Sequence, residues 1–498
     1  MESLQRSAMH RRFGKNGNNT KAVLVRELLF SMNGVDMDIL DKLNSIVWGI
    51  PTVTLILLIG LLYSLQTGFV QLKLLPRSIH ALFDKLKKPG DSSSFQALCT
   101  ALAATVGTGN IAGVAGAIAI GGPGSIFWMW ICAVLGMVTK FAEAVLAVRF
   151  RTEKQCAYTG GPMYIIDKGL GKGWHPMAIC YCLLGTAAAF GVGNATQVNA
   201  AVTGVNSAVS FLGNSGSFPW ALVIGILLAA IAAAAPLGGA RRVGSIAELL
   251  VPVSAVAYIS LCVGALICHW SMIPDALRQI VCGAFQPRAI TGGAVGSCMT
   301  VLRIGAARGV FTNEAGMGTA SIAHSTANVA HPAQQGLMGI MEVFLDTIVI
   351  CTMTALVILT SGVEIPYGID EGALLTTRAF SATYGRWVCI PMAAFLSVFA
   401  VATILGWSFY GLQCITYLMG ESGKFPYLIL QAIAAMLGAL WETADIWTIS
   451  ELLNGLMAIP NLIALLMLRN TVIQLTKEFI RAEHRKQASD RNLPEGSK

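Results

Sequence analysis

The sequence of 498 residues is poor in charge. Asp, Glu, Lys and Arg together make up 12% of its residues, whereas a soluble domain carries about 25%. Hydrophobic residues make up 55%, and the uncharged run 92–139 is much longer than one membrane helix of roughly 20 residues. This scarcity of charge excludes an ordinary soluble globular protein and predicts an all-α integral membrane protein.

The sequence also lacks the short motifs of common enzymes. It contains no CxxC pair, no HExxH, no GxSxG and no phosphate-binding loop, so we expect no enzyme and no cofactor. Most of the twelve cysteines lie in apolar stretches, where they are expected to pack as small hydrophobic residues. The net charge of +8 is spread over loops, which predicts a lipid bilayer as the surroundings and no nucleic-acid partner.

Hydropathy and turn residues divide the chain into eleven apolar segments that predict eleven transmembrane helices. They cover residues 46–66, 93–119, 124–148, 175–210, 218–236, 243–268, 296–327, 336–361, 387–415, 425–441 and 446–469. We expect a polar, disordered N-terminal extension at 1–44, a single membrane domain at 45–470, and a charged tail at 471–498.

Lys and Arg predict the orientation of these helices. With Arg469 assigned to the C-terminal tail, the loops on one side hold twenty basic residues and those on the other side hold four. Basic loops face the cytoplasm, so we expect a cytoplasmic C-terminus. An odd number of helices then places the N-terminus outside, although the seven basic residues of 1–44 oppose that direction.

Ten of the eleven helices form two halves of nearly equal length, 93–268 and 296–470. Each half begins with a glycine-broken apolar segment, at 104–124 and at 304–320. Opened backbone at membrane depth is tolerated where it lines a cavity, and paired breaks of this kind mark the binding site of secondary transporters. The pattern predicts one N-terminal helix followed by a 5+5 inverted repeat with broken first and sixth core helices.

Six ordered motifs resemble those of the alanine/glycine:cation symporter family, also called the sodium:alanine symporters. They are VGTGNIAGVA (106–115), GGPGSIFWMWICAVLG (121–136), TGGPMYII (159–166), GNATQVNA (193–200), FTNEAGMG (311–318) and TILGWSFYG (403–411). The resemblance implies a leucine-transporter-type fold in a bacterial cytoplasmic (inner) membrane. It also implies that sodium, as the co-transported cation, drives uptake of small neutral amino acids such as alanine and glycine.

The first break carries the residues expected to bind both solutes. The family model implies that N–H groups near Thr108 and Gly109 bind the substrate carboxylate. It implies sodium ligands at the carbonyls of Ala103 and Val106, with Thr105 and Asn110 as further possibilities. A seam of small residues that lets two helices pack closely is the alternative interpretation.

The second break contains Phe311, Asn313 and Glu314. Phe311 is expected either to cover the substrate or to pack in the core, and Asn313 to contact the substrate. Glu314 is a carboxylate at membrane depth, where unpaired charge is costly. We expect Glu314 to brace the opened backbone of the neighbouring broken helix, with Arg303 or Arg308 as its partner.

Two further helices supply candidate ligands. Gln197 is expected to contact the substrate, or else to join helices together with Asn194 on the same face. Thr403 is expected to bind sodium, although threonine in a membrane helix often bonds its own backbone. Trp407, four residues later, is expected to line the substrate pocket.

Four charged residues outside the breaks complete the predictions. Lys140 and Glu143, three apart in one segment, are expected to pair in a structural or gating role. Glu342 and Asp346 have no obvious basic partner in the sequence. They predict a second cation site, the wall of a water-filled cavity, or the proton carrier of an alternative proton-coupled amino-acid transporter.

Overall fold

The computed structural model describes residues 37–86, 93–154, 157–213, 219–293, 295–440 and 443–491. Residues 1–36 of the expected N-terminal extension and 492–498 of the tail lie outside this range. The chain comprises two compact units, residues 1–43 and 44–498. In the first unit, the described residues belong to helix α3 (Met37–Val47), so helix begins inside the segment expected to be disordered. The second unit contains all the candidate site residues.

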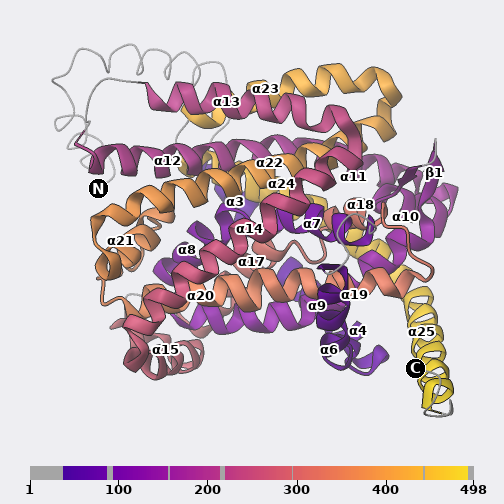
Figure 1. Ribbon diagram of the computed structural model, residues 1–498, viewed down its shortest axis with the longest axis horizontal. Coiled ribbons are helices and arrows are strands. Elements are labelled where there is room, and N and C mark those ends of the chain that lie inside the picture. The colour runs from indigo at the N-terminus through magenta and orange to yellow at the C-terminus, as the bar shows by residue number, and fades with distance from the viewer. Residues whose placement is uncertain are drawn as a thin grey trace. The chain divides into compact units, whose positions relative to one another are not determined.

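Each of the eleven apolar segments is helical (Figure 1). In chain order they are α4 (Ile50–Thr67), α7 (Ser93–Thr105) with α8 (Ala112–Gly121), α9 (Gly124–Phe150), α11 (His175–Phe190) with α12 (Thr196–Phe211), α13 (Trp220–Ala234), α14 (Gly239–Cys268), α17 (Cys298–Asn313) with α18 (Thr319–His324), α19 (Pro332–Val343) with α20 (Thr352–Thr360), α22 (Cys389–Met419), α23 (Lys424–Leu440) and α24 (Thr443–Met467). Within the described residues, seven continuous helical stretches are long and apolar enough to cross a membrane, or eight if the bent pair α7–α8 is one span. The chain is therefore an all-α, multi-pass membrane protein.

Several elements lie outside the predicted segments. They are α5 (Val70–Lys73), α6 (Leu75–Leu86), α10 (Pro162–Gly169), α15 (Ile273–Phe285), α16 (Pro287–Thr291), α21 (Ala373–Tyr384) and α25 (Arg469–Arg491). Strands β1 (Thr152–Lys154) and β2 (Ala157–Thr159) form an antiparallel hairpin in which Glu153 faces Tyr158. Helix α25 shows that most of the charged tail is ordered as helix.

Helix α9 is the centre of the packing. It contacts α19, α17, α15 and α4, and its C-terminal half from Gly136 to Val148 is buried throughout. The turn before it uses Gly122, whose φ of 71° is readily adopted by glycine. A β-carbon at Gly124 would collide with the backbone of Gly283, so this glycine lets α9 begin directly against α15.

Helix α22 crosses the interior beside the break between α7 and α8. Every residue from Ala402 to Leu412 is buried, and α22 packs against α12, α11, α14 and α7. Helices α13, α14 and α23 instead expose large apolar side chains, among them Leu227, Leu249 and Ile433. These exposed apolar faces are what a lipid environment requires.

Two short π-helical stretches interrupt the interior helices. One, η3 (Gly191–Ala195), joins α11 to α12, and the other, η6 (Phe344–Cys351), joins α19 to α20. A π-turn widens the helix by one residue and often occurs at functional sites. Both stretches contribute residues to the site described next.

Candidate functional site

The first break separates α7 from a 3₁₀ turn, η1 (Thr108–Asn110), and the two helical parts meet at 57°. The N–H of Gly107 donates to Asn110 Oδ1 over 2.9 Å. It therefore does not bond the carbonyl of Ala103, four residues earlier. The N–H of Asn110 donates to the carbonyl of Gly107 over 3.3 Å rather than to that of Val106. The carbonyls of Ala103 and Val106, both expected as sodium ligands, thus lose their regular helical donors.

Thr403 on α22 faces this break. Its hydroxyl oxygen occupies the space that a β-carbon at Gly107 would need. The Thr403 side chain is buried, and its hydroxyl has no hydrogen-bond partner among the described residues. A hydroxyl of this kind normally bonds a carbonyl of its own helix, so the unpartnered oxygen is available for a ligand.

Thr108 and Gln197 lie together, as the sequence predicts for two substrate contacts. The Thr108 hydroxyl donates to Gln197 Oε1 over 2.9 Å, and both side chains are buried. Gln197 Nε2 in turn donates to the carbonyl of Val192 over 3.0 Å, within the π-helical turn η3. Asn194 points elsewhere and donates to Gln431 on α23, so it does not share a partner with Gln197.

Gly109 connects the two breaks. A β-carbon at Gly109 would lie 3.7 Å from Thr312 Cγ2 and 4.0 Å from Phe311 Cε1. The first break therefore faces the end of α17 directly. Phe311 also packs against Trp447 of α24, with ring centroids 5.5 Å apart. Phe311 thus lies beside the candidate substrate site and forms part of its packed wall.

The second break follows α17 and uses three residues with positive φ: Glu314 at 53°, Gly316 at 92° and Gly318 at 81°. Glu143 Oε1 accepts hydrogen bonds from the N–H groups of Gly316 and Gly318, each over 3.0 Å. Asn461 Nδ2 donates to the same oxygen over 2.7 Å. Glu143 is therefore the carboxylate that braces the opened backbone of the second break. We expected Glu314 to brace the neighbouring first break, but its bonds go elsewhere.

Glu314 instead joins the second break to α22. Its Oε1 accepts from the indole N–H of Trp407 over 2.9 Å, and its Oε2 accepts from the hydroxyl of Thr319. The expected arginine partner is wrong, because Arg308 pairs with Glu451 over 3.0 Å and with Asp370 over 3.4 Å. Trp407 is held against the second break by this bond, in the wall of the site.

A chain of hydrogen bonds through η6 also links the breaks. Asn110 Nδ2 donates to Asp346 Oδ1 over 2.6 Å, and the Thr347 hydroxyl donates to Asp346 Oδ2 over 2.8 Å. Asn313 Nδ2 donates to Thr347 over 3.2 Å, while its Oδ1 accepts from the N–H of Ala315 over 3.0 Å. Both the nitrogen and the oxygen of the Asn313 amide therefore have partners within the protein, and Asn313 helps to hold the second break in place.

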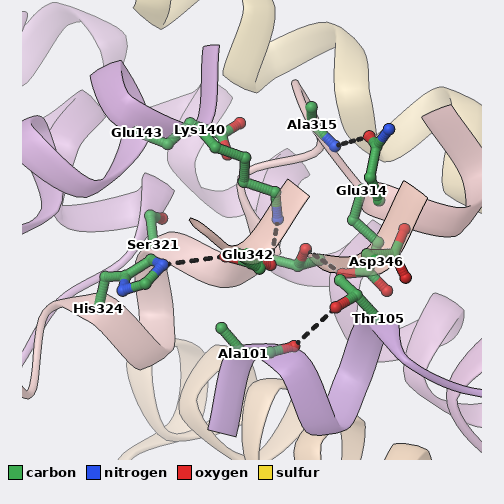
Figure 2. Close-up of polar contacts among 12 residues, drawn as sticks. Ala101, Thr105, Lys140, Glu143, Glu314, Ala315, Ser321, His324, Glu342 and Asp346 are labelled. Carbon is green, nitrogen blue, oxygen red and sulfur yellow. Dashed lines mark hydrogen bonds and ion pairs between the residues drawn. The ribbon is translucent and has the colours of Figure 1, made fainter. Parts of the chain in front are cut away.

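The predicted pairing of Lys140 with Glu143 is wrong. Lys140 Nζ lies 2.9 Å from Glu342 Oε1, and His324 Nε2 lies 3.0 Å from Glu342 Oε2. Figure 2 shows Lys140 and His324 approaching Glu342 from different sides, while Glu143 lies beside Lys140 without an interaction drawn between them. Residues three apart on a helix are near each other, but here the side chain of each one bonds a different helix. The prediction that Glu342 lacks a basic partner is therefore also wrong.

Several residues that hydrogen-bond to the two breaks or to their carboxylates were not predicted from the sequence. They are Asn461, Thr347, Thr319 and Tyr181, whose hydroxyl donates to the carbonyl of Met317 over 3.1 Å. The available signal was a polar side chain inside an apolar segment, most clearly at Asn461. That signal gives no partner, because the partners lie on other helices.

Comparisons with known proteins show which family the chain belongs to. Residues 32–493 match the model of the sodium:alanine symporter family. The sodium/alanine symporter AgcS of Methanococcus maripaludis is 42% identical over 89% of this chain and 97% of its own length. An uncharacterized transporter of Haemophilus influenzae is 42% identical over 89% and 95%, and the amino-acid carrier protein AlsT of Bacillus subtilis is 34% identical over 88% and 91%.

These matches define a secondary transporter rather than an enzyme. The chain belongs to the sodium:alanine symporter family, and it is a symporter of an amino acid and a cation.

Proposed function

We propose that this protein couples the inward movement of sodium to the uptake of small neutral amino acids, with alanine and glycine as substrates. The observation that carries the proposal is the buried, unpartnered hydroxyl of Thr403 opposite Gly107. Sodium is a hard cation that takes oxygen ligands. A hydroxyl oxygen beside backbone carbonyls that lack their helical N–H partners provides oxygen ligands of the kind that such an ion requires.

The sodium site combines Thr403 with the carbonyls of Ala103 and Val106. Asn110 contributes indirectly. Its Oδ1 accepts from the N–H of Gly107, which leaves the carbonyl of Ala103 without that donor, and its own N–H bonds Gly107 rather than Val106. The Thr105 hydroxyl donates to the carbonyl of Ala101 over 3.2 Å, and its lone pairs remain available. Ala402 supplies no second hydroxyl beside Thr403, so the site depends on Thr403.

The amino-acid site lies between the two breaks. We propose that the N–H groups of Thr108 and Gly109 bind the substrate carboxylate, as the N-termini of broken membrane helices do in other transporters. Thr108 and Gln197 line the site through their side chains, and Phe311 and Trp407 form its apolar wall. Thr312 also lies close to Gly109, which supports a small substrate at this position.

We further propose that the eleven helical segments are eleven spans, arranged as one helix plus a 5+5 inverted repeat in a membrane domain of residues 45–470. The helical stretches Trp220–Cys268 and Arg386–Leu440 contain 49 and 55 residues. Each exceeds twice the roughly 20 residues of one span, which supports two passes in each. The excess of basic residues supports a cytoplasmic C-terminus in a bacterial inner membrane. An odd number of spans then supports an external N-terminus.

The experiment is alanine uptake into proteoliposomes with sodium and proton gradients imposed separately. The proposal predicts uptake with the sodium gradient alone and none when choline replaces sodium. A proton-coupled carrier is the alternative, and uptake with the proton gradient alone would establish it. Asp346 is then the candidate carrier, because it bonds the first break through Asn110, whereas Glu342 is already neutralised by Lys140.

A further inference from the structure

Four carboxylates are buried around the two breaks: Glu143, Glu314, Glu342 and Asp346. Three of them have a partner on each oxygen. Glu314 accepts from Trp407 and Thr319, Glu342 contacts Lys140 and His324, and Asp346 accepts from Asn110 and Thr347. Glu143 is the exception among the described residues, and its asymmetry requires an explanation.

Glu143 accepts three hydrogen bonds on one oxygen and none on the other. Oε1 accepts from Gly316, Gly318 and Asn461. Oε2 is fully buried and has no partner among the described residues. Leaving a buried carboxylate oxygen without a donor costs far more than leaving a buried apolar atom.

Asn461 supplies a second unpartnered oxygen beside Glu143. Its Nδ2 donates both to Glu143 Oε1 over 2.7 Å and to the carbonyl of Gly316 over 2.9 Å. Two acceptors around Nδ2 fix the orientation of the amide. Its Oδ1 is also buried, has no donor among the described residues, and lies against Gly318. Two acceptors without a donor, on residues already joined by one hydrogen bond, define a site for one proton.

The buried charged side chains around Glu143 favour the binding of a positive charge at its carboxylate. Lys140 is the single buried lysine or arginine among the described residues, and it is paired with Glu342. Glu314 adds another negative charge, while His324 faces Glu342 rather than Glu143. The other titratable groups near Glu143 are the phenols of Tyr63 on α4, Tyr181 on α11 and Tyr410 on α22. Tyr63 and Tyr181 donate to carbonyls. The hydroxyl of Tyr410 makes no hydrogen bond to any described residue, so none of the three phenols satisfies Oε2.

We propose that Glu143 Oε2 binds a proton during the transport cycle and donates it in a hydrogen bond to Asn461 Oδ1. The carboxylate takes the proton from hydronium and releases water, and the reverse step returns the proton to water. One proton would satisfy both unpartnered oxygens at once. A hard metal cation takes about six to eight oxygens when the ion is calcium, many more than the two free oxygens here.

Protonation of Glu143 would affect transport through the hydrogen bonds that its Oε1 accepts. A neutral carboxylic acid holds the N–H groups of Gly316 and Gly318 less strongly than a carboxylate does. Proton binding would therefore loosen the brace on the second break and add one positive charge near the sodium site. This inference rests on the proposed sodium-coupled function. It predicts that protons lower the apparent affinity for sodium.

The test measures the sodium concentration for half-maximal alanine uptake between pH 5.5 and 8.5. In the wild type this concentration should rise about threefold or more towards low pH, because the bound proton adds one positive charge near the sodium site. Glu143→Gln is always neutral and can donate to Asn461. Its sodium concentration for half-maximal uptake should therefore be high and the same at every pH. Glu248→Gln is the control, because that carboxylate on α14 accepts from Gln96 outside the site, and it should keep the pH dependence.

Infrared difference spectra between the two pH values provide a readout that does not depend on transport. The wild type should show the C=O band of a protonated carboxyl, and Glu143→Gln should lack it. Asn461→Asp is a second, nearly isosteric variant. Its two adjacent carboxyls should share a proton and move the pH dependence of uptake to higher pH.

An unchanged pH dependence or an unchanged infrared band in Glu143→Gln would overturn the proton site. If sodium fails to drive uptake in the wild type at every pH, the proposed function fails instead. The infrared band still decides the proton site in that case.

Discussion

The hydroxyl oxygen of Thr403 lies where a β-carbon at residue 107 would be placed. Gly107 therefore gives α22 direct access to the opened backbone between α7 and α8. The Thr403 hydroxyl is buried and has no hydrogen-bond partner in the described part of the chain, so no hydrogen bond there explains the close approach. This relationship connects the break in the backbone to the proposed sodium site.

Gly107→Ala tests the close approach itself. The added methyl group should displace the Thr403 hydroxyl, and we expect the sodium concentration for half-maximal uptake to rise by at least about tenfold, which corresponds to about 1.4 kcal/mol. Gly173→Ala is the control, because a β-carbon there meets no other atom within 4 Å. Normal sodium dependence in Gly107→Ala would show that Thr403 has no role in binding the ion.

Thr403→Val keeps the volume of the side chain and removes one oxygen. Loss of one ligand should raise the sodium concentration for half-maximal uptake by about tenfold or more, while uptake at saturating sodium is largely retained. Thr186→Val is the matched control, since that hydroxyl donates to the carbonyl of Cys182 on its own helix. The two variants should differ clearly in sodium titrations of alanine uptake, and equal titrations would contradict the assignment.

Trp407→Phe removes the indole N–H that bonds Glu314. We expect apparent alanine affinity to fall by about fivefold or more, because a buried carboxylate oxygen loses its donor and the wall of the site shifts. Trp130→Phe removes a similar bond, from the indole of α9 to Thr352, and should have little effect. Concentration series of alanine uptake would show this difference, and an unaltered affinity in Trp407→Phe would place Trp407 outside the site.

The sequence predicted the helices and the breaks because both depend on local properties. Apolar segments determine where membrane helices lie, and clusters such as Gly316 and Gly318 determine where a helix opens. The motifs also predicted Thr108 and Gln197 as substrate contacts, and these two side chains lie together. These features need little knowledge of how distant segments pack.

Partners across helices could not be predicted in the same way. Lys140 and Glu342 are 202 residues apart, and nothing local distinguishes Glu342 from Glu143 as the partner of this lysine. The π-helical stretch η6 was equally hidden, although it aims Asp346 at Asn110. A one-residue widening of a helix leaves no clear pattern in hydropathy.

The buried pair of Lys140 and Glu342 leads to a prediction about stability. Lys140→Met leaves Glu342 without its cation and should destabilise the protein by about 3–5 kcal/mol. The double variant Lys140→Met/Glu342→Leu removes both charges and should be less destabilised than Lys140→Met. Thermal unfolding in detergent gives the order of stability of the wild type and the two variants. A Lys140→Met protein as stable as the wild type would contradict a structural role for the pair.

The most direct test of sodium coupling is the alanine gradient at which net flux stops. Proteoliposomes are prepared with a tenfold inward sodium gradient, no membrane potential and a series of outward alanine gradients. At one-to-one coupling, the sodium gradient supplies about 1.4 kcal/mol, so net alanine flux should vanish when internal alanine is about tenfold above external. Adding 100 mV, negative inside, contributes about 2.3 kcal/mol more and should move that ratio to roughly 500. Flux that stops at equal alanine concentrations, whatever the sodium gradient, would contradict sodium-coupled symport.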